Sequence, residues 1–189
     1  MPPKLQIPRI IWASLLMSSL GLLGVAQLLL VEVAAPPEAS LLWILVAVAL
    51  ADAVASFVIP AANYRRLAAN VKLEVVTESV STDIPVGFYR DAGSTRRVPA
   101  DLEAARSLAH RLFLTPFILS LAFAESIAIL GVVVRALGFP VSFAVPFMLV
   151  AALLIALRFP TEARIFKLLE TAKNVELGGS SGARSASFG

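Results

Sequence analysis

Residues 112–136 read LFLTPFILSLAFAESIAILGVVVRA, a long, largely apolar stretch with Glu125 near its centre. About 20 apolar residues are enough for a helix to cross the hydrocarbon core of a membrane. A carboxylate in the middle of that core costs roughly 2.5 kcal/mol or more, so a chain keeps one there only with a compensating partner or a use. The stretch therefore predicts a membrane-spanning helix, and it makes Glu125 the first candidate for a functional residue.

Three further apolar runs, 10–31, 41–60 and 142–158, approach or exceed the same length. The composition agrees, because 58% of the residues are hydrophobic, the mean hydropathy is +0.84 and only 15% are charged. In soluble domains about a quarter of the residues are charged. The first run is longer than the core of a signal peptide, so we expect it to remain as a span. The sequence thus predicts an all-α membrane protein with four transmembrane helices.

The basic residues predict how the chain is oriented. Fifteen of the 16 lie before the first run, between the second and third runs, or from the last residue of the fourth run (Arg158) onward, which leaves only Arg135 for the other side. The positive-inside rule then places both termini and the loop of residues 62–110 in the cytoplasm of a bacterium, with the spans in its inner membrane. These residues flank apolar runs and lack interleaved aromatic residues, so we expect the lipid bilayer and no nucleic acid as a partner, despite a pI of about 9.7.

The second and fourth runs end in similar sequences, FVIPAANYRRL at 57–67 and LRFPTEARIFK at 157–167. This similarity predicts two helical hairpins in a parallel repeat, unlike the inverted repeats of many secondary transporters. We expect a first transmembrane hairpin at 1–68, a cytoplasmic loop at 69–100, a second transmembrane hairpin with a cytoplasmic helix extension at 101–170, and a flexible tail at 171–189.

The cytoplasmic loop has local structure signals of its own. Asp101 is a candidate N-cap for a helix that runs directly into the third span. Residues 71–80 mix apolar and polar side chains, which fits either a short strand or a continuation of the second span. Residues 91–94, Asp-Ala-Gly-Ser, are typical of a turn. About 50 residues are too few for an independent catalytic domain.

A second acidic residue, Asp52, lies inside a predicted span. Counted from the outer ends of their runs, Asp52 and Glu125 are each roughly 16 Å deep, at the midplane of a core about 30 Å thick. Two carboxyl groups at one depth can share a proton or bind a cation, with Ser120, Ser126 and Gln27 as supporting polar residues. Alternatively, each acid is neutral, bonds to a serine or a carbonyl, and serves only helix packing.

Several classes of chemistry lack the residues they need. The chain has no cysteine and one histidine, His110, which leaves no ligand set for zinc or copper. It contains no phosphate-binding glycine loop, no His-Glu metal motif and no serine nucleophile elbow. We therefore expect no enzyme activity, no cofactor and no metal site.

Two resemblances add to this interpretation. Residues 124–134, AESIAILGVVV, resemble the ion-binding helix of the rotary ATP synthase proteolipid (subunit c), and this resemblance implies that Glu125 binds a proton. The whole layout is similar to a group of uncharacterised bacterial four-helix integral membrane proteins. These share two hairpins, a Glu in the third helix and a Phe-Pro-Thr exit like that at 159–161. The second resemblance implies a topology and no activity.

From these observations we expect a small non-enzymatic membrane protein that binds a proton or cation at Glu125, with Asp52 as a second carboxyl. It would serve as an accessory or ion-coupled subunit, bound to another membrane-complex subunit or to itself. Two alternatives remain open. In one, the chain is a structural or assembly protein whose cytoplasmic loop docks a partner while Glu125 only packs. In the other, it is a proteolipid like subunit c.

Overall fold

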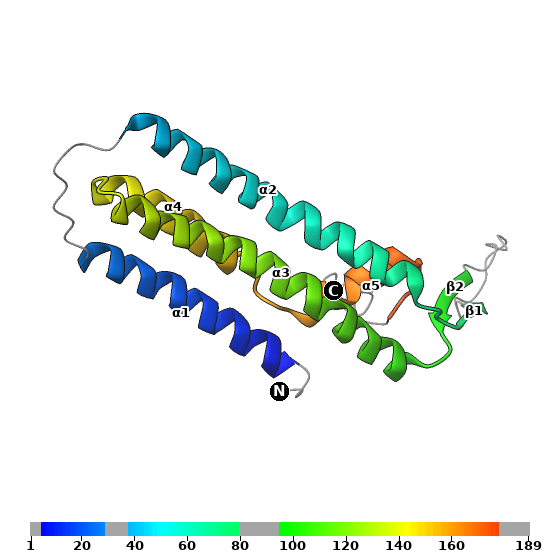
Figure 1. Ribbon diagram of the computed structural model, residues 1–189. Coiled ribbons are helices and arrows are strands. Elements are labelled where there is room, and N and C mark those ends of the chain that lie inside the picture. The colour runs from blue at the N-terminus through cyan, green and yellow to red at the C-terminus, as the bar shows by residue number, and fades with distance from the viewer. Residues whose placement is uncertain (1–4, 29–37, 80–94, 178–189) are drawn as a thin grey trace, which may run out of the picture. The chain divides into compact units, whose positions relative to one another are not determined.

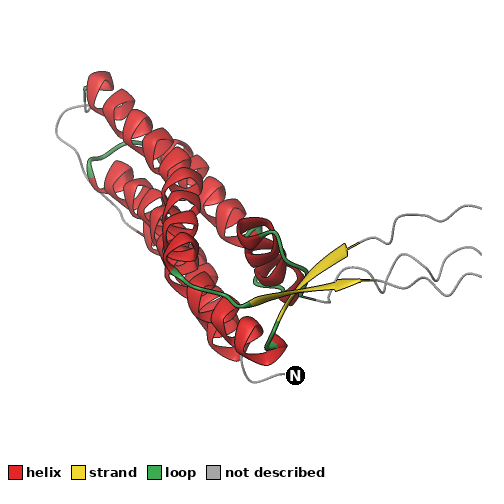
Figure 2. Cartoon of the chain, turned by 90° about the vertical axis from the view of Figure 1, so that its right-hand side faces the viewer, coloured by secondary structure: helices red, strands yellow, loops and turns green. Residues whose placement is uncertain are grey.

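The computed structural model describes residues 5–28, 38–79 and 95–177. This part of the chain is mostly helical, as Figures 1 and 2 show. Its helices are α1 (Gln6–Leu28), α2 (Ala39–Asn70), α3 (Leu102–Ala136), α4 (Val141–Ala156) and α5 (Glu162–Lys173), and its strands are β1 (Val75–Ser79) and β2 (Thr95–Pro99). The small sheet is an addition to the all-α fold predicted from the sequence.

Three helices, α1, α2 and α3, are long and apolar enough to cross a membrane, and α4 is a shorter apolar helix of 16 residues. This confirms a helical chain with several membrane-type helices. The four-span arrangement in two repeated hairpins stays a prediction. At 1.5 Å per residue α4 is roughly 24 Å long, somewhat shorter than a hydrocarbon core of about 30 Å.

The chain divides into two compact units. We call the first the helical unit, comprising Met1–Tyr64 and Leu114–Pro160, and the second the mixed unit, comprising Arg65–Phe113 and Thr161–Gly189. The helices α2 and α3 each begin in one unit and end in the other.

In the helical unit α3 is the most enclosed helix. In the most apolar 18-residue stretch of α3, 44% of the residues are buried, against 11% in the corresponding stretch of α1 and 6% in that of α2. The core of the unit joins Ile127, Ala128 and Val134 of α3 to Ala144, Phe147 and Ala151 of α4. Large apolar side chains such as Trp43 and Val54 of α2 are exposed, with 70% and 63% of their surface accessible. Such an apolar exterior suits contact with hydrocarbon or with another apolar surface.

A glycine permits the close approach of α3 and α4. A Cβ added at Gly131 would lie 3.0 Å from the Ala144 carbonyl oxygen and 3.1 Å from both Met148 Cγ and Phe147 Cβ. The first of these neighbours is backbone, which cannot move without shifting α4. Four residues then connect the two helices, with Gly138 at a φ of 91° in the left-handed region that favours glycine.

Replacing Gly131 by alanine should destabilise the helical unit by roughly 1–3 kcal/mol, the usual cost of overpacking a core. The matched control is Gly24→Ala in α1, where a new Cβ would have no neighbour within 4 Å. That variant should be neutral or slightly stabilising, because alanine is the better helix former by about 1 kcal/mol. Unfolding in detergent, followed by tryptophan fluorescence, measures both. Equal stability of the two variants would contradict the close packing of α3 on α4.

The mixed unit contains the sheet and the first turns of α3. β1 and β2 pair antiparallel, from Val75 opposite Pro99 to Ser79 opposite Thr95 (yellow in Figure 2). Asp101 accepts a hydrogen bond from the Ala104 backbone N–H at 2.9 Å, which confirms it as the N-cap. The helix that it caps runs without a break to Ala136, as predicted. Of the two interpretations of residues 71–80, the strand is the one observed, and the predicted turn at 91–94 lies outside the described residues.

The last helix, α5, also belongs to the mixed unit. Its buried face carries Ile165 and Leu169. Beyond its end, Val175 and Leu177 are also buried, and the Leu177 N–H donates to Glu170 Oε1 at 2.9 Å. The described beginning of the predicted tail, residues 171–177, is therefore packed in this unit. Residues 178–189 lie outside the described chain.

Candidate functional site

The carboxylate of Glu125 lies between α3 and α1. Ser18 donates its hydroxyl to Oε1 at 2.6 Å, and Ser19 donates its hydroxyl to Oε2 at 2.7 Å. Two consecutive serines of α1 therefore satisfy one carboxylate oxygen each. Bonds of this length are typical of hydroxyl donors to an ionised carboxylate.

The surroundings of this carboxylate are uneven. Ser19 is buried, with 1% of its surface exposed. On α3 itself, Ala124 directly before Glu125 and Ala128 three residues after it are fully buried. Glu125 itself is half-buried, and Ser18 is exposed. The group thus lies at the seam of two helices, covered on the inner side and open on the other.

The second acid, Asp52, lies between α2 and α3. Its Oδ2 is 2.6 Å from the hydroxyl oxygen of Ser126, which in turn is 2.8 Å from the backbone carbonyl oxygen of Phe123. Both distances are within hydrogen-bond range. Asp52 and Ser126 are both half-buried.

The two acids therefore have different partners. Glu125 and Ser126 are consecutive on α3 and point about 100° apart around the helix, so one contacts α1 and the other α2. Among the described residues no hydrogen bond joins Asp52 to Glu125. Sharing of one proton between the two carboxyls stays a prediction.

A buried arginine, Arg158, contacts Ser56, which lies one turn along α2 from Asp52. Arg158, which follows α4 and is only 6% exposed, donates from Nη2 to the backbone oxygen of Ser56 at 3.1 Å and to its Oγ at 2.8 Å. Its guanidinium also lies over the Phe57 ring, 4.4 Å from the centroid. Residues four apart on a helix share a face, so Ser56 and Asp52 are neighbours.

The two remaining predicted polar residues contribute less. Ser120 is buried and donates to the Phe117 carbonyl of its own helix at 2.8 Å. Gln27 is exposed near the end of α1, and within the described part of the chain its amide makes no hydrogen bond. Neither side chain reaches an acid.

Sequence reasoning missed Ser18, Ser19, Ser56 and Arg158. Ser18 and Ser19 could have been found by depth, because they lie about as far from the end of α1 as Glu125 does from the end of α3, roughly 15 Å at 1.5 Å per residue. Arg158 was grouped with the cytoplasmic basic residues because it follows an apolar run. Its long side chain reaches back along the helices to Ser56, and its guanidinium is buried there, the reverse of a snorkelling arginine, which keeps its charge in water.

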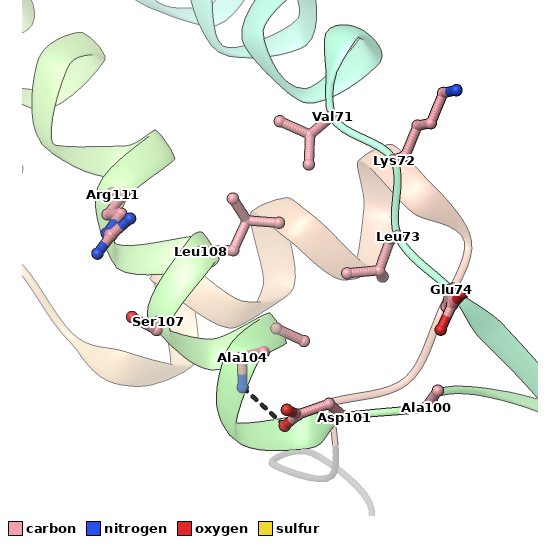
Figure 3. A pocket seen from close by; sticks show the side chains of 11 residues that line it. Val71, Lys72, Leu73, Glu74, Ala100, Asp101, Ala104, Ser107, Leu108 and Arg111 are labelled. Carbon is pink, nitrogen blue, oxygen red and sulfur yellow. Dashed lines mark hydrogen bonds between the residues drawn. The ribbon is translucent and has the colours of Figure 1, made fainter.

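The described residues contain no group of three His, Cys, Asp or Glu side chains placed to hold a metal ion. The mixed unit has a cavity of about 500 Å³. In Figure 3 the side chains of Val71, Leu73 and Leu108 point into this space, while the amine of Lys72 points away and Asp101 caps α3. The cavity therefore lacks convergent polar groups, and the acids of the helical unit are the better candidate site.

Comparison with known proteins adds no assignment: no protein-family model, curated protein or solved structure matches this chain. The candidate site therefore stands on its geometry alone.

The bond between Ser19 and Glu125 should appear as an energetic coupling. In a double-mutant cycle of Ser19→Ala and Glu125→Ala, we expect the two destabilisations to differ from additivity by about 0.6 to about 1.7 kcal/mol, the average and the largest value measured for hydrogen bonds between membrane helices. Unfolding in detergent measures all four proteins. The matched control is Ser120→Ala with Glu125→Ala, which should be additive within about 0.5 kcal/mol because Ser120 bonds only to its own helix. Equal coupling in both cycles would rule out the contact.

Proposed function

We propose that this chain is a non-enzymatic, multi-pass membrane protein that binds a proton or cation at Glu125, with Asp52 as a second site, and acts as an accessory or ion-coupled subunit of a membrane complex. The observation that supports it most is the pair of serine hydroxyls on the Glu125 carboxylate in the middle of two apolar helices.

The energetic balance favours a use for Glu125 beyond packing. A hydrogen bond between membrane helices contributes about 0.6 kcal/mol on average. A carboxylate at the centre of a bilayer costs roughly 2.5–3.5 kcal/mol. Two average bonds offset only part of that cost, whereas an alanine or a leucine at the same position would carry no such cost.

The chemistry of the site favours a proton as the ligand. The four polar atoms at Glu125 are all oxygens, which also suit hard cations. However, the hydroxyl and carboxylate oxygens are 2.6 and 2.7 Å apart, which is direct hydrogen-bond contact. Because both carboxylate oxygens accept, Glu125 has the geometry of a base that can take up a proton from the exposed side of the seam.

The proposed membrane arrangement has four spans in two hairpins of the same sense, in a bacterial inner membrane with both termini in the cytoplasm. Its support is the distribution of basic residues and the lengths of the apolar helices. In that arrangement the exposed apolar faces of α1 and α2 contact lipid or another subunit.

Labelling with a hydrophobic carbodiimide tests the proposal, because this reagent modifies protonated carboxyl groups within apolar surroundings. We expect mass spectrometry to locate the label at Glu125, with a lower yield at high pH. Suppression of the label by Na⁺, Li⁺ or K⁺ at constant pH would identify a cation as the ligand, and indifference to all three would identify a proton.

The matched control is Glu125→Gln, which keeps the size and the acceptor oxygen but has no carboxyl to modify. It should lose the label at this position and retain the fold. Absence of label at Glu125 at every pH, together with unchanged stability of Glu125→Gln, would overturn the proposal. The carboxylate would then be a packing residue, as in the structural alternative.

A further inference from the structure

The backbone hydrogen bonds of the small sheet in the mixed unit (yellow in Figure 2) show which groups face outward. The Ala100 N–H donates to the Glu74 carbonyl oxygen at 3.0 Å, so these two residues form a hydrogen-bonded pair of the antiparallel ladder. Such pairs recur at every second residue along the two strands. The backbone groups of the remaining residues of β1 therefore point away from β2. These outward residues are Val75, Thr77 and Ser79.

The outer edge of β2 is occupied. Arg97 lies opposite Thr77, so its carbonyl also points outward, and it accepts a hydrogen bond from the Glu176 N–H at 2.9 Å. Pro99, two residues further along, has no N–H to offer at this edge. A covering segment and a proline are two of the ways in which proteins protect a sheet edge from further pairing.

The outer edge of β1 has neither form of protection. Among the described residues, no backbone hydrogen bond reaches the outward N–H and C=O groups of this strand. Its register with β2 contains no bulge, and its sequence VVTES contains no proline and no lysine. Val76 and Thr77 are exposed, Val76 with 51% of its surface accessible. An open edge built from residues that favour strands is a template for another strand.

We propose that β1 pairs antiparallel with β1 of a second copy of this chain, so that the two small sheets join into one sheet of four strands. The two-fold axis of this dimer passes between the two Thr77 residues. Because Thr77 is the middle one of the three outward residues, each outward N–H of one copy meets an outward C=O of the other. Three N–H groups on each copy give six hydrogen bonds in all.

The order of residues in β1 favours a second copy as the partner. In this register Thr77 lies opposite Thr77 of the second copy, and threonine pairs are favourable across neighbouring strands. Glu78, the one charged residue of the strand, comes opposite Val76 of the second copy, so like charges are not directly opposed. Two copies in one membrane are also confined together, which helps a short edge to pair. The surface adds self-association to the proposed function and does not depend on ion binding at Glu125.

Cysteine cross-linking of the full chain in its membrane tests the register, since the chain has no native cysteine. Residues directly opposite each other in an antiparallel pair have Cα atoms about 4.5–5.5 Å apart, within the range of a disulfide. We expect Thr77→Cys to give a disulfide-linked dimer on mild oxidation. Val76→Cys and Glu78→Cys should give little dimer alone, because like positions are then diagonal and roughly 7–8 Å apart. Expressed together, these two variants should link to each other.

Thr77→Pro provides a second readout of the same edge. The Thr77 N–H points away from β2, so its loss leaves the pairing of β1 with β2 intact and removes a bond at the centre of the proposed interface. We expect this change to abolish the linkage between the cysteines at 76 and 78. The matched control, Thr77→Val, should retain it, because valine keeps the N–H and favours strands.

Three results would overturn the proposal: no dimer from Thr77→Cys, equal linkage of the three single-cysteine variants, or unchanged linkage in Thr77→Pro. Linkage of Thr77→Cys to a different protein would also overturn it, because the edge would then belong to another partner. Carbodiimide labelling at Glu125 is read separately from all of these outcomes, so the two proposals fail independently.

Discussion

The polar pair Glu125-Ser126 on α3 constrains the whole helical unit. Since consecutive residues on a helix point about 100° apart, these two side chains need partners on two different neighbouring helices. Ser18 and Ser19 of α1 meet the first, and Asp52 of α2 meets the second. In apolar surroundings such polar side chains seek each other, because hydrocarbon offers them no hydrogen bond. The rotation of α1 and α2 about their own axes follows from this requirement.

The fourth helix of the unit, α4, is held by a close contact with α3 and by hydrogen bonds to α1 and α2. Gly131 lets α4 approach α3 closely at one end of the unit, and Trp12 of α1 donates to the Ile155 carbonyl of α4 at 2.7 Å. Further along α4, Arg158 ties the helix end to Ser56 of α2. The most enclosed helix, α3, thus carries the acid and the serine of the candidate site on a scaffold held by contacts with three helices. Such support holds the side chains of a site in fixed geometry.

The sequence predicted the features that depend on local pattern. Apolar runs identify long helices because hydropathy alone decides whether a segment can lie in hydrocarbon. Asp101 could be assigned as a cap because the N-cap interaction spans only three residues. The pairing of β1 with β2 was not predictable, since it joins short strands across some 15 intervening residues. The serine partners of Glu125 needed knowledge of which helices are neighbours and how each is turned. Arg158 shows the same limit, because a charged residue after an apolar run predicts a membrane boundary and says nothing about where its side chain reaches.

The central claim is that Glu125 lies at mid-depth in the bilayer and faces the neighbouring helix. The chain has no native cysteine, so single cysteines at positions 122, 124, 125, 128 and 129 can carry a nitroxide label without background. The collision rates of each label with oxygen and with a water-soluble nickel complex then report its exposure and depth in lipid. We expect high oxygen access at the exposed positions 122 and 129, low access at 124, 125 and 128, and little contact with nickel at any of them. A label at 125 that is as open to oxygen as one at 129, or that is reached by nickel, would contradict the account.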